Sequence, residues 1–167
     1  MNTNLQIRPM IPQDWKAVKR IYKIGMESGK ATFETKVPDW EQWDQKHLDI
    51  GRLVAILDQK VVGWIALSAT STRQVYFGVA EISVYIDPDF RKRGIARKLL
   101  EEVIKVSEEE GFWTLQSSIF RENHASYQLH KSLGFREIGY REKVAKRDGV
   151  WKDNILLERR SNVIGLD

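Results

Sequence analysis

The sequence predicts an α/β (α+β) domain in which a mixed sheet carries helices on both of its faces. Some segments alternate apolar and polar residues with a period of two, as strands do, and others repeat apolar residues every three or four positions, as helices do. These segments follow one another as strand, two helices, three strands, helix, strand, helix and two strands, an order that favours a layered mixed sheet. A chain of 167 residues fits one domain, 1–167, with a substantial core.

The first half of the chain is expected to contain three strands and two helices. The predicted strands are 5–8, 52–57 and 61–68, and the predicted helices run from Pro12 to about Met26 and from Pro38 to Gly51. Proline is common in the first turn of a helix, and glycine commonly ends one. Residues 58–60 are predicted to form the turn of a hairpin. Residues 28–37, around Phe33, and 69–76, which contain Arg73, are predicted to be irregular.

A strand, a short turn and a long helix between Glu81 and Gly111 form the centre of the chain. Apolar residues at 82, 84 and 86 alternate with polar ones, and Pro88 ends the strand because it fixes φ and lacks an amide donor. The helix after it has an apolar stripe at Ile95, Leu99, Val103 and Val106. Gly111 is suited to the left-handed conformation that often closes a helix.

The remaining segments are a strand at 113–120, a helix at 123–133 and two final strands at 137–145 and 153–158. Asn123 is a good N-cap for the helix, and Gly134 is suited to end it. The last two strands flank a turn at 147–149. We therefore expect a helix, a strand, a helix and a final pair of strands in the second half of the chain.

Composition excludes several classes of site and protein. The chain has no cysteine, which excludes disulfides, thiolate zinc sites and a cysteine nucleophile, and its three scattered histidines predict no metal site. No apolar run is long enough to span a membrane, and the first residues lack the apolar core of a signal peptide, so we expect a cytoplasmic protein. The net charge of +4, from 27 basic and 23 acidic residues, suits an anionic small ligand as well as a polyanion.

Basic residues and a glycine lie where the central strand turns into its helix, in the order Arg91-Lys92-Arg93-Gly94-Ile95-Ala96, with Arg97 following. The first amides of a helix have no intrahelical acceptor, and the helix dipole makes that end partly positive. A glycine lets a bulky phosphate approach the backbone. The pattern therefore predicts a pyrophosphate site, although an ordinary strand–helix connection with a solvated basic turn would show the same residues.

The Arg-x-x-Gly-x-Ala turn between a strand and a helix resembles the acetyl-CoA motif of the GNAT superfamily of N-acetyltransferases. The resemblance implies the GNAT fold, with a mostly antiparallel sheet, and acetyl-CoA as co-substrate. It also implies cofactor contacts at two further places. The backbone of Val84, Tyr85 and Ile86 would pair with the pantetheine arm of CoA and help to hold the acetyl carbonyl, and Asn123 would contact that arm in addition to capping its helix.

Within the superfamily, five motifs resemble the phosphinothricin acetyltransferase group. They are Ala31–Thr35, the R-x-x-Y-x-x-x-x-E arrangement of Arg73, Tyr76 and Glu81, the E-x-S-V-Y run from Glu81, His130 in Leu129–Phe135, and the G-x-W-x-D run 149–153. The resemblance implies a small amino acid-like acceptor amine, bound by Phe33, Arg73 and Tyr76. It also implies a homodimer, since relatives of this type commonly pair.

Direct acyl transfer would need a base for the incoming amine and an acid for the leaving thiolate. Glu81 is our candidate base, through a water, because a carboxylate at the start of a buried central strand is costly unless it is used. His130 occupies the place of the tyrosine that protonates the thiolate in most GNAT members. The alternatives are a structural carboxylate for Glu81, a packing role for His130 and a solvent-facing loop arginine for Arg73.

Two other functions are compatible with the basic turn. A nucleic-acid binder could use the same cations, but five glutamates follow them on the helix and would repel a phosphate backbone. A catalytically silent acyl-CoA sensor would keep the cofactor site without the reaction. We expect acetyl-CoA and an amine as partners, and neither nucleic acid nor a membrane.

Overall fold

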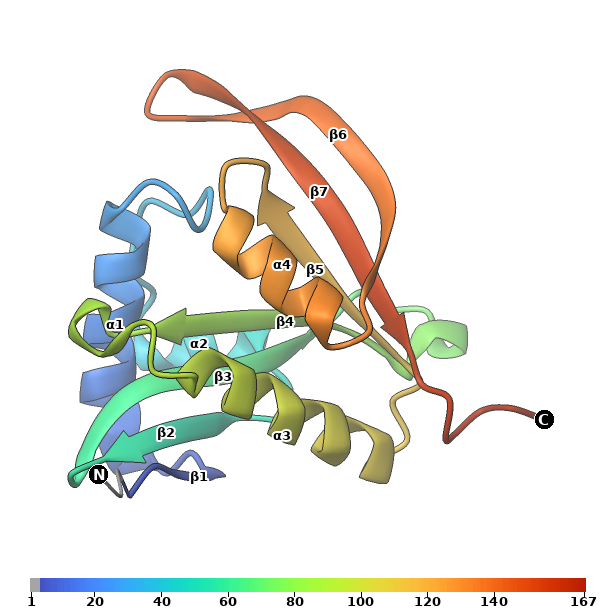
Figure 1. Cartoon of the computed structure of the whole chain (residues 1–167), viewed down its shortest axis with the longest axis horizontal. Coiled ribbons are helices and arrows are strands. Elements are labelled where there is room, and N and C mark those ends of the chain that lie inside the picture. The colour runs from blue at the N-terminus through green and yellow to red at the C-terminus, as the bar shows by residue number, and fades with distance from the viewer. Residues whose placement is uncertain (1–3) are drawn as a thin grey trace.

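The computed structural model describes residues 4–167 and has a seven-stranded sheet in the order β1-β2-β3-β4-β5-β7-β6 (Figure 1). The strands are β1 Gln6–Pro9, β2 Leu53–Leu57, β3 Lys60–Ala69, β4 Val79–Ile86, β5 Thr114–Phe120, β6 Arg136–Arg147 and β7 Val150–Arg160. The helices are α1 Trp15–Glu27, α2 Trp40–Lys46, α3 Ile95–Glu109 and α4 His124–Ser132. Among the strands of these described residues, only β4 and β5 pair in parallel. The predicted fold class, a mixed and mostly antiparallel sheet, is confirmed.

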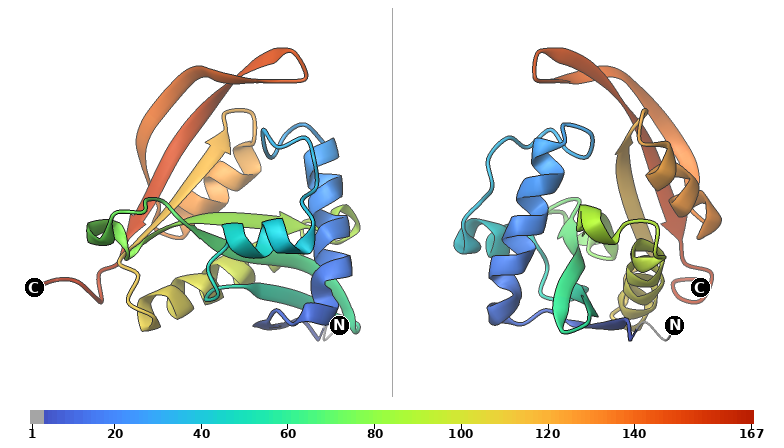
Figure 2. Two further views of the ribbon diagram at one scale, coloured as in Figure 1. Left: turned by 180° about the vertical axis from the view of Figure 1, so that it is seen from behind. Right: turned by 60° about the vertical axis from the view of Figure 1, so that its left-hand side comes forward.

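Helices cover both faces of the sheet, as Figure 2 shows. On one face, α1 and α2 bury Val18, Ile21 and Trp43 against Val54 and Trp64 of the sheet. On the other, α3 buries a second apolar cluster, and α4 packs beside it. The α3 residues in that cluster are Ile95, Leu99, Leu100 and Val103. The predicted helical stripe of α3 is thus the surface that faces the sheet, apart from Val106.

Several element boundaries differ from the sequence prediction. The first predicted helix begins with a 3₁₀ turn, Pro12–Asp14, before α1. The second was expected to reach Gly51 but ends at Lys46, because His47 is extended and the Leu48 amide donates to the Leu67 carbonyl oxygen of β3 at 2.8 Å. Hydrogen bonding to the sheet therefore competes successfully with the last turn of that helix.

The β6–β7 hairpin is longer than predicted and projects beyond the rest of the sheet (Figure 1). Asp148 and Gly149 have φ values of +50° and +78°, which suits a tight two-residue turn and lets pairing continue up to it. At this turn the Arg147 guanidinium donates to the Met26 carbonyl oxygen of α1 at 2.6 Å. The hairpin tip is thereby attached to the end of α1.

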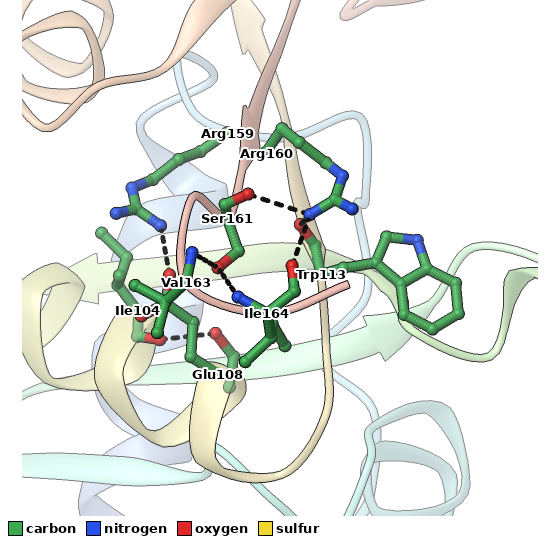
Figure 3. Close-up of polar contacts among 9 residues, drawn as sticks. Ile104, Glu108, Trp113, Arg159, Arg160, Ser161, Val163 and Ile164 are labelled. Atoms are coloured by element: carbon green, nitrogen blue, oxygen red, sulfur yellow. Dashed lines mark hydrogen bonds and ion pairs between the residues drawn. The ribbon is translucent and has the colours of Figure 1, made fainter. Parts of the chain in front are cut away.

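The end of β7 is attached to α3, to the residue before β5 and to the chain that follows it (Figure 3). The Arg160 guanidinium donates to the carbonyl oxygens of Trp113 at 3.3 Å and Ile164 at 3.1 Å. Arg159 pairs with Glu108 of α3 at 3.0 Å. These contacts fix the end of β7 and so the position of that strand beside β5.

The two parallel strands diverge at the centre of the sheet. β4 and β5 pair only at Val79–Thr114, Ala80–Leu115 and Glu81–Gln116. β4 continues to Ile86 and β5 to Phe120 without further pairing between them, so the sheet opens beyond Glu81 (Figure 1). The backbone groups of β4 that face this opening have no partner in β5, and a ligand in the opening can bond to them.

Within 4–167 no helix combines the length and the apolar composition needed to cross a bilayer. The same residues contain no cluster of three or more metal-ligating side chains.

Candidate active site

Two adjoining cavities lie along the opening between β4 and β5. The larger has a volume of about 470 Å³ and is lined from α1, α2, β3, β4, β5, α4, β7 and the segment between α1 and α2. The smaller, of about 370 Å³, is lined mainly by α4, the segment after α1, the end of β4 and the turn before α3. Six residues line both cavities: Ala31, Val84, Tyr85, Asn123, Ser126 and His130. We call this shared region the junction.

The turn before α3 has the geometry expected of a phosphate site. Gly94 is the N-cap residue at φ +76°, and α3 has no side-chain cap. A Cβ built on Gly94 would meet no described atom within 4 Å, so the surface over its backbone is open. The amides of Ile95, Ala96 and Arg97 follow in the first turn of α3 and have no intrahelical acceptor. This arrangement fits a pyrophosphate with its charge at the positive end of a helix.

Six of the predicted cofactor residues line the smaller cavity, and the others lie in or next to the turn before α3. Those that line the smaller cavity are Val84, Tyr85, Ile86, Arg91, Ala96 and Asn123. The Ile95 side chain is buried in the core, so only its backbone faces outward. The Arg93 guanidinium lies 5.2 Å from the Phe90 ring, and Arg97 donates to the Ser132 hydroxyl at 2.7 Å. Lys92 is exposed. The Asn123 amide oxygen accepts from the Ser126 amide, so its capping role is confirmed.

Glu81 lies in the larger cavity, on the face of the sheet that carries α1 and α2. Strand alternation places Ser83 and Tyr85 on the same face, whereas Ile82 packs in the core on the α3 side. The carboxylate is open to the cavity, but the surrounding protein excludes enough water to raise the pKa of Glu81 above its usual value. The positive charge of Lys46 lowers that pKa and opposes part of the rise. A carboxylate with a raised pKa is a better proton acceptor than one in water.

His130 reaches the junction from α4, on the opposite face of the sheet. Its side chain is 1% exposed, and its Nδ1 lies 2.8 Å from the Ser126 carbonyl oxygen. Since a carbonyl oxygen only accepts, Nδ1 carries the hydrogen and Nε2 keeps a lone pair. Nε2 is buried without a partner in the described structure. Burial lowers the pKa of His130 and so favours the neutral ring, which lines both cavities at the junction.

The predicted acceptor residues are separated by the fold. Phe33 lines the larger cavity, and its ring lies 4.7 Å from that of Phe120. Arg73 and Tyr76 are exposed in and beside the turn Gln74–Tyr76, where the guanidinium lies 5.5 Å from the tyrosine ring. Neither residue lines the cavity in a single chain. Their role in acceptor binding stays a prediction.

Several residues that line the larger cavity were not singled out from the sequence. Lys46 is the one lysine or arginine among the described residues lining it, and its Nζ lies 3.3 Å from the Glu34 carboxylate. Ser118 and Asn154 also line it. Lys46 looks like an ordinary polar-face residue of a helix, and no local signal distinguishes it. Ser117-Ser118 places two adjacent hydroxyl side chains in this strand and could have been noticed.

Comparison with known proteins identifies the family. The model of the acetyltransferase (GNAT) family matches residues 15–135. A phosphinothricin N-acetyltransferase from Alcaligenes faecalis is 32% identical over 93% of this chain and 82% of its own length. The L-amino acid N-acetyltransferase AaaT of Escherichia coli is 25% identical over 94% of this chain and 98% of its own.

A solved structure adds the cofactor. The GNAT phosphinothricin acetyltransferase from Sinorhizobium meliloti, in complex with acetyl-CoA, superimposes with a TM-score of 0.86 at 26% identity. The match covers 93% of this chain and 88% of that one. The open backbone over Gly94 and the unpaired edge of β4 fit such a co-substrate. This chain therefore belongs to the GNAT acetyltransferase family and is an acetyl-CoA-dependent N-acetyltransferase.

Proposed function

We propose that the enzyme acetylates the primary amine of a small amino acid-like acceptor that carries an anionic group, of the phosphinothricin or methionine sulfoximine and sulfone type. The observation that carries this proposal is the pairing of a proton acceptor, Glu81, with a cation, Lys46, in one polar cavity that meets the cofactor side only at the junction. An ammonium group and an anionic group on one small molecule match these two charges. The relatives named for phosphinothricin and L-amino acids support the same acceptor class.

The cofactor side of the proposal rests on backbone groups. Acetyl-CoA supplies the activated acyl group when it is bound. The amides of Ile95, Ala96 and Arg97 would hold its pyrophosphate, and the smaller cavity would hold the pantetheine arm between β4 and α4. A β4 amide within Val84–Ile86 would donate to the acetyl carbonyl oxygen, where negative charge develops during the reaction. No covalent bond to the enzyme is needed.

Glu81 would act on the acceptor before the new bond forms. An ammonium group cannot attack a carbonyl carbon, so it first loses one proton to Glu81 through a water. The nitrogen then forms a bond to the acetyl carbon while the carbon–sulfur bond breaks. The nitrogen must release its second proton as well, and the thiolate takes up one. Glu81 and His130 lie on opposite faces of the opening, which suits proton removal on one side and proton delivery on the other.

His130 would relay a proton to the thiolate, and His130→Phe is expected to lower kcat by about 10²-fold. Its neutral ring delivers a proton only after Nε2 has taken one up. Acetyl-CoA affinity should change little, because the main cofactor contacts lie elsewhere. Stopped-flow release of thiol at several pH values measures the effect. An unchanged kcat would assign His130 to packing against Phe135, whose ring lies 5.0 Å away.

Lys46 would bind the anionic group of the acceptor in place of Glu34, and Lys46→Met is expected to raise the acceptor KM about tenfold. The variant keeps the aliphatic stem and removes the charge. Steady-state kinetics with methionine sulfoximine should show nearly unchanged kcat and acetyl-CoA KM. Lys46→Arg keeps the charge and should stay close to wild type. Arg73→Ala, measured in the same assay, tests the second predicted anion ligand.

The acceptor class is tested on the wild-type enzyme by comparing methionine sulfoximine with its decarboxylated amine. A clear preference for the amino acid is expected, because the amine lacks the anionic group. Equal rates would exclude binding of an anionic group by Lys46 or Arg73 and would favour another amine, so a polyamine and a short peptide belong in the panel. Acetyl-CoA binding without acetylation of any amine would indicate a non-catalytic acyl-CoA-binding protein.

A homodimer and a cytoplasmic location also belong to this proposal. Exposed apolar side chains lie along the projecting hairpin, including Ile138, Tyr140, Val150 and Trp151. A second copy that covers them would remove this surface from water.

A further inference from the structure

We propose that Asn154 and Ser118 bind the polar end of the acceptor's side chain and select acceptors that place an N–H donor beside an oxygen. A sulfoximine and a primary carboxamide have this arrangement. The inference rests on the proposed function, since it concerns which amino acid-like acceptor fits the larger cavity. It names two specificity-determining residues that lie away from the reacting groups.

Asn154 and Ser118 come from adjacent strands and face the same cavity. Asn154 of β7 pairs with Phe120 of β5, and Ser118 lies two residues before Phe120, on the same face of that strand. Both side chains line the larger cavity. Phe33 contacts Phe120 on this face, so apolar rings lie beside the polar pair. The wall can therefore hold a short aliphatic side chain that ends in a polar group.

Only one of the two polar atoms of the Asn154 side-chain amide has a hydrogen-bond partner in the described structure. Its Nδ2 donates to the Ser118 hydroxyl oxygen at 2.8 Å. Its Oδ1 is buried and has no partner in the described structure, and Asn154 as a whole is only 7% exposed. A buried acceptor without a donor is costly, and native proteins usually satisfy such groups. A ligand that brings a donor to Oδ1 satisfies it.

The pair offers the cavity one acceptor and one donor. The acceptor is Asn154 Oδ1. The donor is the Ser118 hydroxyl, because its oxygen already accepts from Nδ2 while its hydrogen is free to point into the cavity. Ser118 is exposed to the cavity, so a ligand can reach it. The pair thus recognises an N–H and an oxygen held side by side.

Three side-chain ends, two of nearly equal size and one smaller, differ in how they meet this pair. A sulfoximine carries an imine N–H and an oxygen, which match Asn154 and Ser118 respectively. A sulfone carries two oxygens and places one of them against Oδ1, where two acceptors meet without a hydrogen. A thioether carries neither group. Sites that hydrogen-bond a substrate group discriminate strongly against analogues that lack it.

The test compares kcat/KM for methionine sulfoximine and methionine sulfone at saturating acetyl-CoA. The two acceptors differ in one group only: the sulfoximine carries an imine N–H on sulfur where the sulfone carries a second oxygen. We expect the wild-type enzyme to prefer the sulfoximine about tenfold or more. Asn154→Leu removes the acceptor oxygen and should bring the ratio close to one, with the acetyl-CoA KM unchanged. Ser118→Ala should reduce the ratio as well, because the Asn154 amide is then free to turn.

Ser68→Ala serves as a matched control, since it makes the same substitution in the same cavity away from the pair, and it should keep the wild-type ratio. Ser118 is exposed, so its alanine variant is expected to fold even if Asn154→Leu does not. Equal efficiencies for the two acceptors, or a preference for the sulfone, overturn the inference and leave the proposed function standing. Acetylation of neither acceptor overturns both.

Discussion

Glu81→Gln is expected to lower kcat by about 10²–10⁴-fold, the range usual for loss of a general base. Glutamine keeps the shape of the side chain but cannot take the proton of the incoming ammonium. The pKa of Glu81 is raised by desolvation, so the wild-type rate should fall as pH drops through that raised value. In the variant this acidic limb should disappear, and its deficit should shrink at high pH, where more amine is already neutral. Steady-state rates across the pH range measure both effects.

The same substitution should act on stability in the opposite direction. A raised carboxyl pKa means that the folded state holds the proton more tightly than the unfolded state does, so the ionised form destabilises the fold above that pKa. Glu81→Gln removes this cost, and its Tm should exceed that of the wild type at neutral pH but not at acidic pH. Glu109→Gln, on the exposed side of α3, is the matched control and should leave both activity and Tm unchanged. An unchanged rate profile for Glu81→Gln would place the base elsewhere.

Helices and strands with a periodic sequence were predictable because the spacing of their apolar residues matches the spacing of the residues that become buried. The α3 stripe faces the sheet because residues three and four apart share one side of a helix. Boundaries set by distant contacts were less predictable. The second helix stops at Lys46, before its predicted end, where the chain bonds to β3. The turn at 147–149 was predicted, but the length of the β6–β7 hairpin was not, because pairing between the two strands continues right up to Asp148 and Gly149.

The candidate site likewise has a part that the sequence predicted and a part that it did not. The turn before α3 was predictable because its residues are consecutive, and Gly94 proves to have the left-handed φ that favours glycine. The pairing of Asn154 with Ser118 was not, since 36 residues separate them and no motif links the two positions. Arg73 is the opposite case, a residue that the sequence assigned to the site and the single chain does not bring there. A motif placed it in the acceptor site, but a single chain leaves it on an exposed turn.

Gly94→Glu is expected to abolish acetyl-CoA binding, with an affinity loss of about 10²-fold or more, while the fold survives. The Cβ would extend into the open surface over the first amides of α3, and the carboxylate would occupy and repel the place of a phosphate. Isothermal titration with acetyl-CoA measures the loss directly. Gly94→Val should give a similar result through bulk alone.

The left-handed backbone at Gly94 requires its own control. At φ +76° any side chain costs about 1–2 kcal/mol of stability, so Gly94→Ala shares the strain without most of the bulk or the charge. Thermal melting should show equal destabilisation in the Ala and Glu variants, with binding lost far more in the latter. Arg91→Ala should weaken binding less than Gly94→Glu, because backbone donors carry most of the phosphate contact. Wild-type affinity in Gly94→Glu would mean that the pyrophosphate does not bind at this turn.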